Sequence, residues 1–266
     1  MRRLLIRPGA IGDCLLAFAA LEFLKADYTE VWAPRAIAPL VWFADKTTAL
    51  SDTGIDMAGL GDLRADNAIK AKLSEFDEVV SWYGANRPEF REALAGLRCV
   101  FHTALPPANC TMHATDFFCR QVGAPLGLCA KLAVERRARR DTVVINPFSG
   151  SRRKNWPLAK FRELAQQLPL PVEWTAGPEE ELPEACRFES LADLTQWIAE
   201  ARLYIGNDSG ITHLAAVAGV PVIALFGPTD PTLWAPRGNE VIVLRHEPLC
   251  DLSVNTVLQA VRTADF

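Results

Sequence analysis

Short apolar runs alternate with helical segments through the first half of the chain. The runs at residues 4–6, 31–33, 79–82 and 99–101 have the length and apolar character of buried strands. A largely apolar helix is predicted from about residue 13 to residue 25. Strands that alternate with helices in this way form parallel βαβ units, so the pattern predicts an α/β fold.

The second half continues the alternation. Strands are predicted at 142–146 and 172–175, a helix near 158–168, and a last helix around 254–262. The clearest unit is residues 203–231, LYIGNDSGITHLAAVAGVPVIALFGPTDP, which predicts a strand, a tight polar turn, a short helix, a second strand and a glycine-proline loop. This half is therefore also predicted to be α/β.

A charged stretch separates the two halves. Residues 134–141, VERRARRD, have no apolar face and are interpreted as a solvated linker, although their charge could also bind an acidic partner. We therefore predict two domains, 1–135 and 142–266, each of which starts with a strand that ends in a glycine-containing loop. The expected architecture is two Rossmann-like domains with parallel sheets facing a central cleft.

Composition narrows the class of protein. The chain has 28 basic and 32 acidic residues, a net charge of −4, so no overall positive field recruits nucleic acid. Seven cysteines without a CxxC pair favour reduced thiols in a cytoplasmic protein. Pro8, Gly9, Gly12 and Asp13 interrupt what would be the apolar core of a signal peptide, and no run approaches the ~20 apolar residues of a membrane span. We expect a soluble protein, at most peripheral to a membrane.

The turn at 206–210, GNDSG, is the strongest candidate binding site. Its unpaired N–H groups and the helix dipole suit a phosphate or pyrophosphate. Asp208 is expected to fix the turn through backbone N–H bonds. His213 is either structural or a donor to the phosphate. Ser209 and Gly210 complete the turn.

A second loop, SGSRRKNWP at 149–157, places three cations after a strand. It is either an exposed basic loop or a phosphate clamp, with Lys154 as the charge and Ser149 or Ser151 as the hydroxyl donor. The loop does not match GxxxxGK[ST], and GxGxxG is absent from the chain, so neither a P-loop NTPase nor a typical NAD enzyme is predicted.

Asp13 follows two glycines at the start of the first helix. It is either a helix-capping acid or a carboxylate aimed at a ligand, where it could act as a general base. Two Cys-x-x-His pairs, at 99–102 and 110–113, are the only metal-like spacing, and no metal site is predicted from them because structural zinc ligands normally lie on turns.

These segments together resemble glycosyltransferase family 9, the heptosyltransferases of lipopolysaccharide core synthesis. The matching strings are IRPGAIGDCLLAFAAL, NPFSGSRRKNWPLAKFREL and NDSGITHLAAVAGVPVIALFGPTDP, with weaker similarity in HATDFFCRQVG and TAGPEEE. The resemblance implies a GT-B fold with an N-terminal acceptor domain and a C-terminal nucleotide-sugar domain. It also implies an inverting, metal-independent transfer without a cofactor, usually from ADP-heptose to a core oligosaccharide anchored in lipid A.

The resemblance also implies roles for individual residues. Asp13 corresponds to the catalytic base, in an acceptor-side loop with Gly9 and Gly12. Lys154 corresponds to a phosphate-binding residue, and Glu179 is the candidate acid for the donor ribose. The remaining donor-binding candidates are Ser149, Asp208, Ser209, Gly210 and His213. A lipid-linked acceptor would bring the protein to the cytoplasmic face of the inner membrane.

Two other functions stay open at this point. One is a degenerate family member that binds a nucleotide and has a non-catalytic assembly role. The other is a GT-B-like sugar-nucleotide epimerase or hydrolase, which needs no acceptor. The retention of both Asp13 and Lys154 disfavours the degenerate alternative, because a pure binder needs no base. The donor sugar and the acceptor are not fixed by the sequence.

Overall fold

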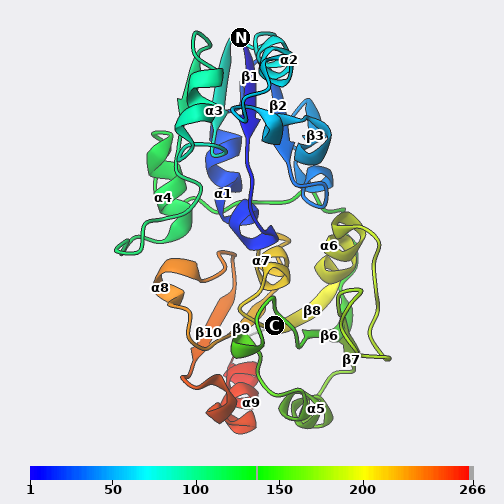
Figure 1. The fold of residues 1–266 in the computed structure, drawn as a ribbon. Coiled ribbons are helices and arrows are strands. Elements are labelled where there is room, and N and C mark those ends of the chain that lie inside the picture. Colours follow the sequence, from blue (N-terminus) through cyan, green and yellow to red (C-terminus); the bar gives the residue numbers. More distant parts are fainter. Residues whose placement is uncertain (136, 264–266) are drawn as a thin grey trace. The chain divides into compact units, whose positions relative to one another are not determined.

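A computed structural model describes residues 1–135 and 137–263 (Figure 1). The chain divides into two compact units. Unit 1 consists of Met1–Cys110 and Thr115–Leu128; unit 2 consists of Thr111–Ala114 and the described chain from Cys129 onward. Each unit contains one five-stranded sheet, and every strand pair in both sheets is parallel. The predicted α/β class with two parallel sheets is therefore confirmed.

The sheet of unit 1 has the strand order β3-β2-β1-β4-β5. Its strands are β1 (Arg2–Ile6), β2 (Tyr28–Ala33), β3 (Lys46–Ala49), β4 (Glu78–Ser81) and β5 (Cys99–Phe101). The helices are α1 (Ile11–Phe23), α2 (Leu63–Leu73), α3 (Pro88–Ala93) and α4 (Ala114–Gln121), with short 3-10 turns at Ala38–Leu40, Leu50–Asp52 and Ile55–Met57.

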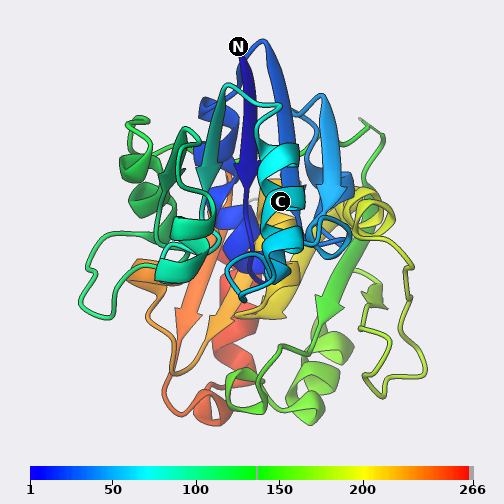
Figure 2. The ribbon, with the colours of Figure 1, turned by 45° about the horizontal axis from the view of Figure 1, so that its top comes forward.

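Both faces of this sheet are covered. Leu4 and Ile6 of β1 share a buried cluster with Ile69 and Leu73 of α2. Alternate residues of a strand point to opposite faces, so Leu5 belongs to the other face. In Figure 2, α2 (cyan) lies in front of the strands and α1 (blue) behind them. Burial of both faces explains why the central strands β1, β2 and β4 contain short continuous apolar runs.

The sheet of unit 2 has the order β10-β9-β8-β6-β7. Its strands are β6 (Arg140–Asn146), β7 (Val172–Trp174), β8 (Ala201–Asn207), β9 (Val222–Phe226) and β10 (Val241–Arg245). The helices are α5 (Leu158–Gln167), α6 (Leu191–Ala199), α7 (Gly210–Val217), α8 (Pro231–Trp234) and α9 (Val254–Thr263), with 3-10 turns at Arg152–Lys154 and Leu249–Asp251. One face packs on α5 and α9 through a cluster that includes Ile145, Ile205, Phe161 and Val257.

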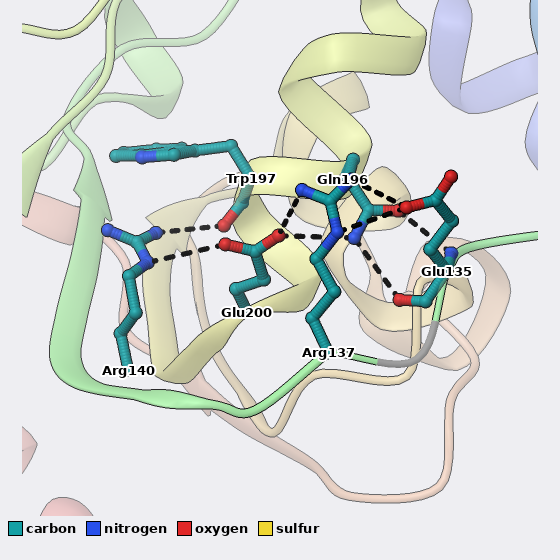
Figure 3. A network of polar contacts seen from close by, with 6 residues as sticks. All are labelled: Glu135, Arg137, Arg140, Gln196, Trp197 and Glu200. Carbon is teal, nitrogen blue, oxygen red and sulfur yellow. Dashed lines mark hydrogen bonds and ion pairs between the residues drawn. The ribbon is translucent and has the colours of Figure 1, made fainter.

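The described residues of the charged stretch at 134–141 are mostly exposed, as expected of a solvated stretch, and they also bond to α6 and its C-terminal end. Residue 136 of this stretch lies outside the described residues. Arg137 donates to Glu200 Oε1 at 3.2 Å, and Arg140 donates to the carbonyl oxygen of Trp197 at 2.9 Å (Figure 3). The backbone N–H of Glu135 donates to Gln196 Oε1 at 2.8 Å. The stretch has no apolar face, but α6 and its C-terminal end supply the carboxylate and carbonyl partners that its charges need.

Within the described residues, no helix is long and apolar enough to cross a bilayer.

Candidate functional site

The predicted polar turn lies in unit 2, between the end of β8 and the start of α7. Ser209 is the N-cap of α7, and its hydroxyl accepts a hydrogen bond from the backbone N–H of Thr212 at 3.3 Å. The N–H of Asp208 donates to Leu225 O of β9 at 2.9 Å. Gly210 is the first residue of the helix. The turn thus presents a helix N-terminus at the carboxyl edge of a parallel sheet, where α/β proteins bind ligands.

Asn207 ties this turn to the basic loop. Its side chain is fully buried; Oδ1 accepts from the N–H of Trp156 at 2.9 Å, and Nδ2 donates to Pro147 O at 2.7 Å. Both partners lie in the loop that follows β6. The sequence analysis did not single out Asn207, because its partners are 51 and 60 residues away. The only local signal is a small polar residue at the end of an apolar strand.

Lys154 lies in the same loop and contacts the turn directly. Its Nζ donates to Asp208 Oδ2 at 2.7 Å. The Asp208 side chain is 6% exposed and the Lys154 side chain 35% exposed, so the pair is partly shielded from water. The adjacent Arg152 and Arg153 are exposed. Of the three cations in the loop, Lys154 is therefore the one that pairs with the turn. Its partner is Asp208, whose carboxylate we had expected to bind the backbone of the turn.

Ser149 has a different environment from Lys154. Its hydroxyl lies 2.6 Å from Asn155 Oδ1 and 2.9 Å from Ser151 O. The hydroxyl proton of Ser149 is therefore used in hydrogen bonds within the loop. Ser149 shapes the loop that carries Lys154 in this structure, and direct contact with a donor stays a prediction.

His213 lies in the first turn of α7 and is 6% exposed. Burial lowers the pKa of its imidazole to about 4, and the neighbouring His113 and Lys154 act in the same direction, whereas Asp208 opposes the shift. The ring is therefore neutral at physiological pH. A neutral imidazole can donate one hydrogen bond to a phosphate but adds no positive charge.

The pH dependence of folding should report this buried histidine. Its pKa is lower in the folded state than the usual 6.5, so the folded protein binds fewer protons than the unfolded chain between pH 6.5 and about 4. The free energy of unfolding should fall as pH falls through this window, by about 3 kcal/mol in all from this group. Urea unfolding of His213→Gln should lack this part of the acid-side loss. Equal losses in both proteins between pH 7 and pH 4 would contradict the assignment.

The acidic loop after β7 gives its neighbouring glutamates different environments. Glu180 Oε2 accepts from the N–H of Gly177 at 2.6 Å, and the backbone oxygen of Glu180 accepts from Arg187 at 2.6 Å. The Glu180 carboxylate also acts on Tyr204, where it adds to the effect of burial in raising the phenol pKa. Tyr204 lies in β8, just before the turn, and its hydroxyl is 3.4 Å from the hydroxyl of Thr212. Glu179, by contrast, is exposed. The Glu180 carboxylate is therefore bonded within the loop and the Glu179 side chain faces solvent, and contact of Glu179 with a donor stays a prediction.

Asp13 lies in unit 1, within the first turn of α1. Its Oδ2 accepts from the N–H of Ala10 at 3.3 Å, so it does act as a capping acid. Gly9 has φ +123°, and a Cβ there would lie 3.1 Å from Asp13 Cβ. Gly9 is therefore required both for the backbone conformation and for the space beside the carboxylate. Gly12 lies inside α1. A carboxylate that caps a helix with one oxygen retains acceptor capacity for a ligand.

The Cys-x-x-His pairs do not form a metal site in the part of the chain that the structure describes, where no group of three or more potential ligands lies together. His102 packs against Trp82, with ring centroids 5.3 Å apart, and His113 Nε2 lies 2.9 Å from Ala235 O. Burial raises the pKa of Cys99 to about 11, so it stays a thiol at neutral pH.

Comparison with known proteins supports the resemblance. Residues 178–259 match the model of glycosyltransferase family 9 (heptosyltransferase). The chain is 32% identical over 119 residues to lipopolysaccharide heptosyltransferase 3 of Escherichia coli, a match over 38% of this chain and 35% of that protein. It is 32% identical over 112 residues to lipopolysaccharide heptosyltransferase 1 of Pseudomonas aeruginosa, over 36% and 32% of the two chains. The matches span about a third of these curated relatives. The predicted similarity to family 9 is confirmed.

Solved structures extend the likeness over the whole fold. E. coli heptosyltransferase WaaC with ADP aligns over 98% of this chain and 99% of its own, with a TM-score of 0.72 and 18% identity. E. coli ADP-heptose lps heptosyltransferase II gives a TM-score of 0.74, 18% identity and 98% coverage of both chains. A family 9 glycosyl transferase from Veillonella parvula gives 0.77 and 18%, over 98% and 96%. At this identity the likeness concerns the fold, and it confirms the predicted GT-B class.

Proposed function

We propose that this chain, in which residues 178–259 match the glycosyltransferase family 9 model, is an inverting glycosyltransferase that takes its sugar from a nucleoside-diphosphate donor. The observation that carries the proposal is the Lys154–Asp208 ion pair beside the N-terminus of α7. It places an ammonium group next to free helical N–H groups, and the two together suit a diphosphate.

The proposed donor is ADP-heptose. WaaC, which shares the fold, was solved with ADP and with ADP-2-deoxy-2-fluoro heptose. In this chain, Lys154, His213 and the turn residues Asp208, Ser209 and Gly210 would hold the diphosphate. We assign the ribose hydroxyls to Glu180 instead of Glu179, because Glu180 is half-buried, is held by the N–H of Gly177 and has an electrostatic effect on Tyr204.

The proposed reaction is a single displacement at the anomeric carbon. Asp13 accepts the proton of the acceptor hydroxyl as its oxygen forms a bond to that carbon. The bond from the carbon to the diphosphate oxygen breaks, and the electron pair leaves with the diphosphate. Lys154 and the N–H groups of α7 meet the negative charge that grows there, and one such preorganised donor contributes about 3 kcal/mol to transition-state stabilisation.

The proposed acceptor is a lipid-linked oligosaccharide of the lipopolysaccharide core. The curated relatives are named lipopolysaccharide heptosyltransferases, and this is the support for the assignment. Such an acceptor would be met at the cytoplasmic face of the inner membrane, with peripheral contact only. A nucleotide-binding assembly protein is not favoured, since Asp13 and the Lys154 pair are both retained.

A nucleotide panel tests the donor site. Saturating ADP, at about 100 times its dissociation constant, should stabilise the folded protein by about 2.7 kcal/mol. UDP, GDP and CDP should stabilise it less. The measurement is the shift in Tm of the purified protein at millimolar nucleotide. A larger shift with another nucleoside diphosphate would keep the transferase and reject ADP-heptose, and equilibrium dialysis that finds no binding of any nucleotide would reject the donor site.

A further inference from the structure

Arg7 is a buried cation that the proposed reaction leaves unexplained. It follows β1 directly and is 1% exposed. Among the described residues it makes no ion pair with a carboxylate; its guanidinium instead donates to two backbone oxygens, Ala104 O at 3.0 Å and Asp13 O at 2.7 Å. Its Nε is buried without a hydrogen-bond partner. An arginine buried in this way lowers the stability of the fold, because its charge is removed from water without a paired anion.

Arg7 connects the start of α1 to three other parts of unit 1. One guanidinium joins the first turn of α1, the loop after β5 and α4, where its Cζ lies 4.4 Å from the ring centroid of Phe118. Its backbone N–H also donates to Trp32 O of β2 at 2.9 Å. On α1, the guanidinium of Arg7 donates to the backbone oxygen of Asp13, the proposed base. Asp13 is therefore held at two points: its backbone oxygen accepts from Arg7, and its carboxylate accepts from the N–H of Ala10.

Asp13 also has an electrostatic effect on the pKa of Arg7. Burial lowers the pKa of Arg7, and the electrostatic effects of Cys14 and Asp13 oppose that shift. Burial raises the pKa of Cys14 to about 11, so its thiol is neutral at pH 7. Asp13 is then the acidic neighbour whose electrostatic effect favours the charged form of Arg7, although the two side chains form no ion pair among the described residues. An apolar side chain would fill this site at a lower desolvation cost, which argues that the charge has a use other than packing.

We propose that Arg7 is the positioning residue for the base: its guanidinium fixes the backbone at Asp13 and thereby holds the carboxylate in place. This inference rests on the proposed function, since it assumes that Asp13 takes the acceptor proton. The planar guanidinium suits this role because it bonds two carbonyl oxygens and stacks on a ring at once, which a lysine cannot do.

Two Arg7 variants and one control test the proposal. Arg7→Met removes the charge and both bonds; Arg7→Lys keeps the charge and loses the fork. Arg3→Met is the matched control, because Arg3 lies in β1, four residues before Arg7, and pairs with Glu78 at 2.7 Å instead of with the backbone of Asp13. The measurements are kcat and donor KM for heptose transfer from ADP-heptose, amide hydrogen exchange of residues 9–14, and Tm.

Arg7→Met should lower kcat on the order of 100-fold, with donor KM within about twofold, because the displaced base affects only the chemical step. Exchange at residues 9–14 should rise about tenfold, and exchange at 207–217 should not change. Arg7→Lys should recover part of kcat, and Arg3→Met should match wild type in kcat. If Arg7→Met does not fold, a wild-type kcat and wild-type exchange in Arg7→Lys overturn the proposal.

The proposal is also overturned if Arg7→Met keeps full kcat and unchanged exchange. Faster exchange throughout unit 1 with an equal loss of kcat in Arg3→Met would show a merely structural role. If wild type transfers no heptose, the proposed function fails instead. In that case the exchange at residues 9–14 still decides whether Arg7 fixes the turn that holds Asp13.

Discussion

Replacing Asp13 by asparagine is expected to lower the rate constant for sugar transfer about 1,000-fold, a loss typical of a missing general base. An amide has the shape of the carboxylate but cannot take the acceptor proton. Its oxygen can still accept from the N–H of Ala10, so the start of α1 should be preserved. Nucleotide binding should change by less than about twofold, because the donor turn lies in unit 2.

Single-turnover transfer and nucleotide titration of the same protein separate these two effects. Glu22→Gln is the matched control, because it makes the same carboxylate-to-amide change on the same helix, at its far end. The control should transfer sugar at the wild-type rate. A normal rate in Asp13→Asn would show that Asp13 only caps the helix and that the base is another group.

Replacing Lys154 by alanine should weaken both binding and transfer. Lys154 provides the ammonium at the proposed diphosphate site, so the dissociation constant for ADP should rise at least about tenfold. The rate constant for transfer should fall about 100-fold further, since the charge on the leaving diphosphate grows in the transition state. Titration calorimetry and single-turnover kinetics give the two values.

Loss of stability is the main alternative explanation for a defect in Lys154→Ala. Asp208 is 6% exposed and would remain as a buried carboxylate without its cation. The double variant Lys154→Ala/Asp208→Asn removes that charge. It should regain Tm but not ADP binding, and recovery of ADP binding would contradict the assigned role. Arg152→Ala, one exposed cation earlier in the loop, should leave ADP binding within about twofold.

The sequence predicted the unit around the donor turn well because its signals are local. The apolar strands β8 and β9 and the glycine-rich turn between them each have a pattern that can be recognised within ten residues. Two edge strands, β3 and β10, were not predicted. Four of the five residues of β10 and two of the four in β3 are only half-buried, so their patterns are weak.

The pairings inside the site depend on the fold. Lys154 and Asp208 are 54 residues apart, and no local pattern distinguishes Lys154 from Arg152 and Arg153. The sequence likewise could not show that the Glu180 carboxylate, and not that of Glu179, accepts the N–H of Gly177, because this depends on how the loop folds. For the same reason, the sequence predicted a solvated stretch at 134–141 but could not predict that Arg137 and Arg140 have partners at α6.

The most direct test of the account is transfer of heptose from ADP-heptose to lipopolysaccharide. The acceptors are lipopolysaccharides truncated at each successive core sugar, and mass spectrometry of the lipid-linked product is the measurement. We expect one acceptor to gain a single heptosyl residue with wild-type protein and to gain none with Asp13→Asn. The account would be contradicted if no acceptor in the series gained heptose, or if Asp13→Asn produced as much product as wild type.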